Sequence, residues 1–112
     1  MQAEIAQRTL QYLGLAARAG RVVVGVPLIC TALSKGAKGK TPVLVVRAND
    51  ASANTAKRIS DRCAYYGVPL LELACDCSTL AKRIGKGEAA VAAVGVTDPG
   101  LAAAIRTLYE NN

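Results

Sequence analysis

The residues best suited to bind a ligand in this chain are basic, and they gather in its first third. Residues 1–40 carry six Lys or Arg residues against the single acid Glu4, whereas the other 72 residues carry eight basic and seven acidic side chains. A one-sided excess of positive charge is typical of a protein with a polyanionic partner, either nucleic acid or a membrane surface. The net charge of +6 and the isoelectric point near 9.4 favour nucleic acid, and a basic surface without a partner is the alternative.

Part of this charge surrounds the stretch RAGRVVVGVPLI, residues 18–29. Its three β-branched residues, Val22 to Val24, suit a short strand. Gly25 permits backbone angles and close approaches that a Cβ would forbid, and Pro27 fits the first turn of a helix. The stretch therefore predicts a strand, a tight turn and a helix start, and a helix start of this kind can face an anion.

Three basic residues bracket that helix start. Arg18 and Arg21 flank the expected strand, and Lys35 lies at the end of the expected helix, where it also complements the helix dipole. Phosphate contacts need positive charge beside closely approached backbone, and this stretch supplies both. We therefore predict that these residues hold the phosphates of a nucleic acid.

Catalysis and metal binding have little support in the sequence. There is no histidine, which excludes histidine-based acid–base and triad chemistry. The four cysteines form no C-x-x-C unit of the kind that binds zinc. The stretch SKGAKGKT, residues 34–41, resembles a phosphate-binding loop, but Ser34 replaces its first glycine and a strand is expected where a helix should follow. We expect no enzyme, no cofactor and no metal site.

No membrane segment or signal peptide is expected. The longest apolar run, Ala89 to Val96, is far too short to cross a membrane. The N-terminus carries Glu4 and Arg8 where a signal peptide needs an apolar stretch. We therefore expect a cytoplasmic protein with no membrane partner.

Helical and strand patterns alternate along the whole chain, and 52% hydrophobic residues suffice for a packed core. Amphipathic periodicity and turn residues predict helices within residues 3–18, 27–34, 49–67, 78–85 and 97–110. Apolar runs predict strands at residues 22–24, 42–47, 68–73 and 89–96. This alternation predicts one α/β domain over residues 1–112, a three-layer α/β/α sandwich with a mixed, or mostly parallel, sheet of about four strands. The last strand is continuously apolar and should be central.

Three blocks of sequence, together with this order of elements, resemble a known family. The blocks are LGLAARAGRVVVG, NDASANTAKRISDRCAYYGVP and LAKRIGKGEAAVAAVGVTDPG. They are similar to the small ribosomal proteins that bind kink-turn RNA, the archaeal "L seven Ae" and eukaryotic "L thirty e" type, and more narrowly to their bacterial YlxQ-like branch. The resemblance covers nearly all of the chain, and it implies an α/β/α sandwich that binds structured RNA.

The resemblance also implies where RNA would bind. In kink-turn binders the second helix opens with a pattern like Gly-x-Asn-Glu-x-x-Lys, whose Asn and Glu contact base edges and whose Lys supports the RNA backbone. Gly25 matches the glycine, but the other three positions fall on Pro27, Leu28 and Thr31, which cannot make those contacts. The family's apolar loop after its fourth helix becomes a Lys-Gly-Glu loop here. The candidate RNA-binding residues are therefore Arg18, Arg21, Gly25, Val26, Pro27, Leu28, Thr31, Lys35, Lys86, Gly87 and Glu88.

Two functions remain as expectations. The first is an RNA-binding accessory protein related to ribosomal proteins, which binds structured RNA, ribosomal or other, through charge and shape. The alternative is a protein-interaction module that docks a partner protein on the apolar helix start of Val26, Pro27 and Leu28. Binding that falls steeply with salt would support the first, and a partner retained after nuclease treatment would support the second.

Overall fold

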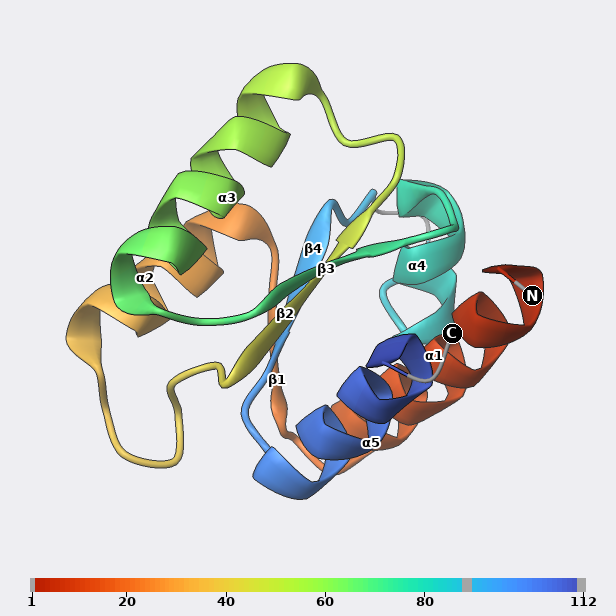
Figure 1. Cartoon of the computed structure of the whole chain (residues 1–112), viewed down its shortest axis with the longest axis horizontal. Coiled ribbons are helices and arrows are strands. Elements are labelled where there is room, and N and C mark those ends of the chain that lie inside the picture. The colour runs from red at the N-terminus through yellow and green to blue at the C-terminus, as the bar shows by residue number, and fades with distance from the viewer. Residues whose placement is uncertain (1, 88–89, 111–112) are drawn as a thin grey trace.

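Five helices and four strands alternate in the computed structural model, which describes residues 2–87 and 90–110 (Figure 1). In chain order they are α1 (Gln2–Arg18), β1 (Val22–Val24), α2 (Val26–Lys35), β2 (Leu44–Ala48), α3 (Ala53–Tyr66), β3 (Leu70–Leu73), α4 (Cys77–Arg83), β4 (Ala93–Val96) and α5 (Pro99–Glu110). Within these ranges, no helix combines the length and the apolar character that a membrane span requires.

The four strands form one mixed sheet in the order β1-β4-β2-β3. β4 runs antiparallel to both of its neighbours, β1 and β2, whereas β3 pairs parallel with β2. The prediction that the last strand is central is thus confirmed, and β1 forms an edge of the sheet. β4 begins at Ala93 rather than at residue 89, because the buried Val91 instead donates its N–H to the carbonyl of Cys77 at the start of α4 (3.3 Å).

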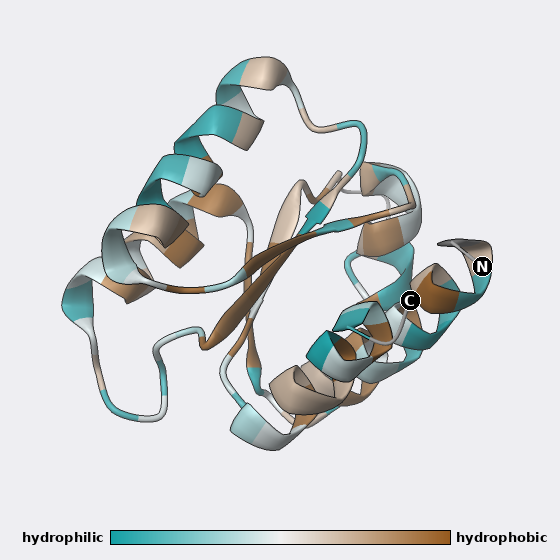
Figure 2. Ribbon diagram, viewed as in Figure 1, coloured by the Kyte–Doolittle hydropathy of each residue, from teal (hydrophilic) through white to brown (hydrophobic). Residues whose placement is uncertain are grey.

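Helices cover both faces of this sheet, which confirms the predicted α/β/α sandwich (Figure 1). α1, α4 and α5 pack on one face, where Val46 of the sheet joins Leu13 and Ile105 in a buried cluster. α2 and α3 pack on the other face, where Val45 joins Ile29. Val45 and Val46 enter different clusters because successive side chains of a strand point to opposite faces. Figure 2 shows the apolar residues gathered on the sheet and the polar residues on the outer sides of the helices.

Two carboxylates fix the start of α4. Asp76 caps the helix by accepting the N–H of Thr79 (2.7 Å), and Asp50 accepts the N–H of Cys77 (2.8 Å). Negative charge is stabilising at the positive end of a helix. Asp76 is thus the cap, and α4 begins at Cys77, one residue before the predicted range of 78–85.

Candidate nucleic-acid interface

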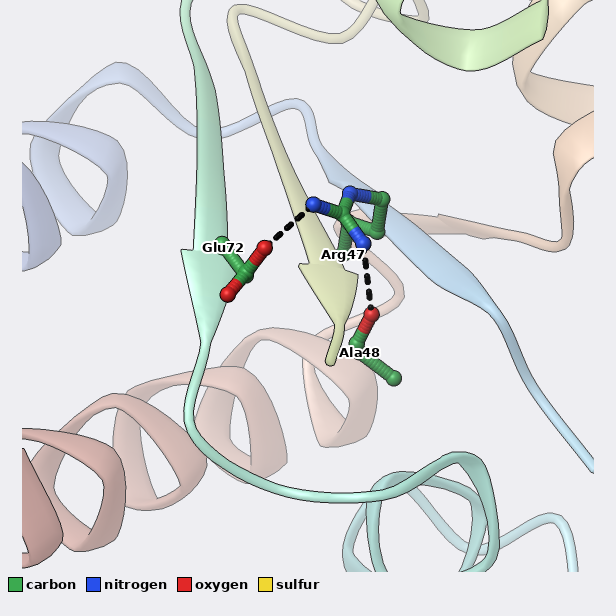
Figure 3. Close-up of polar contacts among 3 residues, drawn as sticks. All are labelled: Arg47, Ala48 and Glu72. Carbon is green, nitrogen blue, oxygen red and sulfur yellow. Dashed lines mark hydrogen bonds and ion pairs between the residues drawn. The ribbon is translucent and has the colours of Figure 1, made fainter. Parts of the chain in front are cut away.

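The seven acidic side chains in the described ranges all have a partner. Three accept backbone N–H groups at helix starts, namely Asp50, Asp76 and Asp98. Four form ion pairs, namely Glu4 with Arg8, Asp61 with Lys57, Glu72 with Arg47 and Glu110 with Arg106. Figure 3 shows the pair that joins β2 to β3, in which Arg47 also donates to the carbonyl of Ala48 (3.1 Å). The carboxylates thus leave most of the basic side chains uncompensated.

The other ten Lys and Arg residues form no ion pair within the described part of the chain. All ten are exposed. They are Arg18, Arg21, Lys35, Lys38, Lys40, Arg58, Arg62, Lys82, Arg83 and Lys86. Exposed cations without nearby carboxylates raise the local positive potential and so attract polyanions.

A groove of about 510 Å³ runs along β1 between α2 and the C-terminal ends of α1 and α4, and we call it the edge groove. Its apolar part comprises the three valines of β1 together with Ala17, Leu28, Ala32, Ala37 and Ile84. Three lysines, Lys35, Lys40 and Lys86, line the same groove, together with Thr31. The groove therefore offers an apolar surface surrounded by positive charge.

The backbone of β1 contributes free hydrogen-bonding groups to the edge groove. The carbonyl of Arg21 accepts the N–H of Thr97, and the N–H of Gly25 donates to the carbonyl of Ala93 (both 3.0 Å). Because alternate residues of an antiparallel strand face its partner, Val22 and Val24 direct their N–H and C=O groups away from β4. A ligand in this groove can thus bond to main chain as well as to lysine.

A second groove lies between α1 and α4, and we call it the α1–α4 groove. It consists of two adjoining hollows of about 390 and 230 Å³, which share Gly14, Arg18, Lys82 and Arg83. Ala17 and Ile84 line both this groove and the edge groove, so the two are continuous.

A third groove, of about 340 Å³, lies between α2 and α3 and contains Arg58 and Arg62. It shares Thr31 and Lys35 with the edge groove. Eight of the ten unpaired cations therefore line three connected grooves, and we call the surface that these grooves form the basic face.

The sequence matches the model of the family described as "Ribosomal protein L7Ae/L30e/S12e/Gadd45 family" over residues 7–105. The chain belongs to this family. It is 42% identical over 98 residues to the "RNA-binding protein YlxQ" of Bacillus subtilis (strain 168), a match that spans 88% of this chain and 91% of that protein. It is 35% identical over 104 residues to a protein of the same name from Enterococcus faecium, across 93% of each chain. The resemblance drawn from the three sequence blocks is confirmed.

Two solved structures have the same fold. A protein of unknown function from Bacillus halodurans C superposes with a TM-score of 0.78 at 30% identity, covering 91% of this chain and 96% of that one. A 15.5kD RNA binding protein of Giardia lamblia superposes with a TM-score of 0.74, covering 96% of this chain and 87% of that one. The second is only 14% identical and therefore speaks for the fold alone.

The structure brings some of the sequence-predicted residues together and separates others. Leu28, Thr31, Lys35 and Lys86 line the edge groove, and Pro27 lies beside it in the α2–α3 groove. Gly25 has a φ of 91°, so the backbone at the start of α2 does require glycine. Among the described candidates, these are the ones that adjoin a shared surface around α2.

The other five candidates lie elsewhere, contribute differently or fall outside the described residues. Arg18 lies in the α1–α4 groove, away from the start of α2, and Arg21 is exposed but lines none of the three grooves. The side chain of Val26 is 5% exposed and packs in the core, so only its backbone can meet a ligand. Gly87 is exposed with a φ of 63°, and Glu88 lies outside the described residues.

Sequence reasoning missed five cations of the basic face, namely Lys40, Arg58, Arg62, Lys82 and Arg83. The sequence could have indicated that Lys82 and Arg83 form no ion pair within α4, because the residues one turn earlier, Ser78 and Thr79, are not acidic. No local signal places these residues beside α1.

Two of the four cysteines have thiols whose pKa is strongly raised. Burial raises the pKa of Cys63 to about 11, and burial with a hydrogen bond to Asp50 raises the pKa of Cys77 to about 11. Both thiols stay protonated near neutral pH, and the thiolate is the reactive form. Within the described ranges, no three cysteine or carboxylate side chains come together to hold a metal ion.

Proposed function

We propose that this chain binds structured RNA through the basic face, chiefly by contacts to phosphate. The observation that carries the proposal is the segregation of charge. The described carboxylates are engaged elsewhere, while eight cations that form no ion pair with any of them line three adjoining grooves. Relatives that are 42% and 35% identical bear the name RNA-binding protein, which supports the same ligand class. We propose with it that the chain acts by binding and not by catalysis, and that it acts in the cytoplasm.

Salt dependence tests this proposal directly. Each neutralised duplex phosphate contributes about −0.9 to the slope of log affinity against log salt, and each single-strand phosphate about −0.7. Titration of an RNA duplex of about 12 base pairs between about 50 and 200 mM salt should give a slope of roughly −3 or steeper. Absence of binding at the lowest salt, or an affinity that ignores salt, would show that the basic face is not an RNA site.

We also propose that the chain has little preference for a kink-turn over a plain duplex. Pro27 has no N–H, and Leu28, which is 61% exposed, has no side-chain polar atom. The Thr31 hydroxyl donates to the carbonyl of Pro27 (3.1 Å), so its hydrogen is already used within the helix. The first turns of α2 therefore present no side chain that can donate to a base edge, and only the Thr31 oxygen can still accept.

The matching experiment restores the family pattern with Pro27→Asn, Leu28→Glu and Thr31→Lys in one variant. Side-chain pairing to a base edge is worth about 1–3 kcal/mol of discrimination on DNA, so two such contacts, worth about 2–6 kcal/mol together, should give a kink-turn preference of roughly 30-fold or more. Both proteins are titrated against kink-turn and duplex RNA at one salt concentration. If the unmodified protein already prefers the kink-turn and binds it with nanomolar affinity, recognition must come from elsewhere, and the loop at Lys86 is the first place to look.

A protein partner is the second candidate function, and one observation favours it. Leu28 is a large apolar side chain, 61% exposed, on a groove whose other lining is largely apolar. A protein partner should then stay bound to the wild-type chain after nuclease treatment and be lost from Leu28→Gln. The RNA affinity of Leu28→Gln should stay within about two-fold of the wild-type value, because no phosphate contact is lost.

A further inference from the structure

The α1–α4 groove is lined by the last turns of two helices whose ends are already capped by backbone. At the end of α1, the N–H of Gly20 donates to the carbonyl of Ala17 (3.1 Å), and the N–H of Arg21 donates to the carbonyl of Ala16 (2.8 Å). At the end of α4, the N–H of Lys86 donates to the carbonyl of Ala81 (2.8 Å), and the N–H of Gly85 donates to that of Lys82 (3.2 Å). Basic side chains are therefore not needed to satisfy these carbonyls.

Three cations nevertheless converge there. Arg18, Lys82 and Arg83 line the groove, all three are exposed, and none has a carboxylate partner in the described residues. Among the residues that the structure describes, no acidic side chain lines the groove. Like charges held together destabilise a surface slightly, whereas a bound anion removes that penalty.

The helices α1 and α4 pack closely beside this groove. The added Cβ of an alanine at Gly14 would meet the carbonyl oxygen of Arg83 at 3.4 Å, so α1 and α4 approach each other closely at this point. Residues distant in sequence thereby share one positively charged groove. The C-terminal ends of α1 and α4 also stabilise nearby cations through the helix dipoles. This stabilisation is the same with and without a ligand, so it adds nothing to binding.

From this arrangement we infer that the α1–α4 groove is a second RNA-backbone site, which binds phosphates of the same RNA that occupies the edge groove. The inference rests on the proposed function. Ala17 and Ile84 line both grooves, so a continuous ligand passes from one to the other. The grooves together present six cations, Lys35, Lys40 and Lys86 in one and Arg18, Lys82 and Arg83 in the other. A helical RNA stem carries closely spaced phosphates on two strands, so we take it as the ligand.

The experiment compares two triple variants with the wild-type chain on an RNA duplex of about 12 base pairs. The test variant is Arg18→Ala/Lys82→Ala/Arg83→Ala. The control is Arg8→Ala/Lys57→Ala/Arg106→Ala, which changes net charge equally but removes only cations that have carboxylate partners. The test variant should lose up to about 100-fold in affinity at about 0.15 M salt and two to three units of salt slope, and the control should change by less than about three-fold. Melting temperature should stay within about 4 °C for both.

Failures of the inference and of the proposed function give different results. If the wild-type chain binds no duplex at low salt, both fail. If the wild type binds but the test variant keeps its affinity and slope, the proposed function stands and the second site is refuted. If the test variant unfolds, or loses affinity while its salt slope stays unchanged, a further variant decides. Arg18→Lys/Arg83→Lys keeps both positive charges. A wild-type salt slope in that variant supports phosphate contacts, and a slope clearly shallower than the wild-type one refutes them.

Discussion

The basic face and the outer surface of α1 and α5 use the same residue types in opposite ways. On α1, Arg8 lies 3.4 Å from Glu4, and on α5, Arg106 lies 3.7 Å from Glu110, each one helical turn away. On the basic face, none of the eight cations in the grooves has such a partner among the described residues. Net charge alone cannot make this distinction, because a paired arginine is neutralised locally. What marks a candidate ligand surface is the absence of partners, more than the number of cations.

The largest effect expected from this contrast is a loss of RNA affinity in Lys35→Ala/Lys40→Ala/Lys86→Ala, which removes the three lysines of the edge groove. At a slope of about −0.9, one phosphate contact raises affinity roughly five-fold when the salt falls from about 1 M to about 0.15 M. Loss of three contacts should therefore lower the affinity at about 0.15 M salt by roughly 100-fold. Titration against an RNA duplex measures it. The contrast would be broken if Arg8→Ala/Lys57→Ala/Arg106→Ala lost as much, because binding would then follow net charge rather than the grooves.

A second prediction concerns the backbone that sets α2 beside the edge groove. Gly25→Ala should destabilise the fold by about 1–3 kcal/mol, because a φ of 91° is a strained conformation for any residue with a Cβ. Nothing lies within 4 Å of the added Cβ, so the effect comes from the backbone and not from a clash. Chemical denaturation measures the change.

Gly14→Ala is the matched control for that measurement. Gly14 is an interior position of α1, and its added Cβ would make an ordinary contact at 3.4 Å. Alanine there should therefore be neutral or stabilising by up to about 1 kcal/mol. Equal losses of stability at both positions would show that the positive φ of Gly25 adds no cost beyond that of placing alanine in a helical glycine position.

Local patterns were sufficient to predict the architecture. Alternating apolar runs and turn residues indicated four strands and five helices, and the unbroken apolar run that ends at Val96 indicated the central strand. The start of β4 was missed because Val91 bonds to the carbonyl of Cys77, a partner that no local pattern in residues 89–96 reveals. Strand limits depend on tertiary partners in this way, whereas strand existence does not.

The candidate site was only partly accessible to the same reasoning. Lys35 and Lys86 were identified, from a helix end and from a family resemblance, and both line the edge groove. The meeting of Arg18 with Lys82 and Arg83 depends on how closely α1 and α4 pack, which the sequence of neither helix specifies. Tertiary contact, not residue type, defines that half of the basic face.

A third prediction tests the cap that holds α4, the helix that carries two of these cations. The pKa of Asp76 is lowered in the folded chain because its carboxylate accepts the backbone N–H and the side-chain hydrogen bond of Thr79. Its contribution to stability is therefore fully present above the unfolded pKa, near 4, and is lost as pH falls through the lower folded value. Asp76→Ala should lower the melting temperature by a few degrees at neutral pH.

The pH profile separates that cap from general acid denaturation. The difference in melting temperature between wild type and Asp76→Ala should shrink below about pH 4, because the protonated carboxyl no longer accepts the Thr79 N–H as a charged group. Asp76→Asn, which keeps an acceptor oxygen, should lie between the two. A difference that persists unchanged to low pH would mean that Asp76 acts through something other than its charge.

The smallest effect comes from giving one cation of the basic face the kind of partner found on α1 and α5. Ser78 is exposed on α4, one turn before Lys82, so Ser78→Glu creates a Glu-to-Lys pair at the favourable helical spacing. Exposed pairs of this type stabilise a helix by about 0.3–0.5 kcal/mol, and Glu also suits the first turn. The new carboxylate would neutralise Lys82, which otherwise contacts one phosphate. RNA binding should therefore weaken by about two- to five-fold, and the salt slope should fall by less than one unit. Stability and affinity would thus move in opposite directions, which a variant that merely disturbs α4 cannot produce. Ser78→Gln keeps the size without the charge and should leave both unchanged. An equal loss of affinity in Ser78→Gln would show that the position, and not the unpaired charge of Lys82, matters to the ligand.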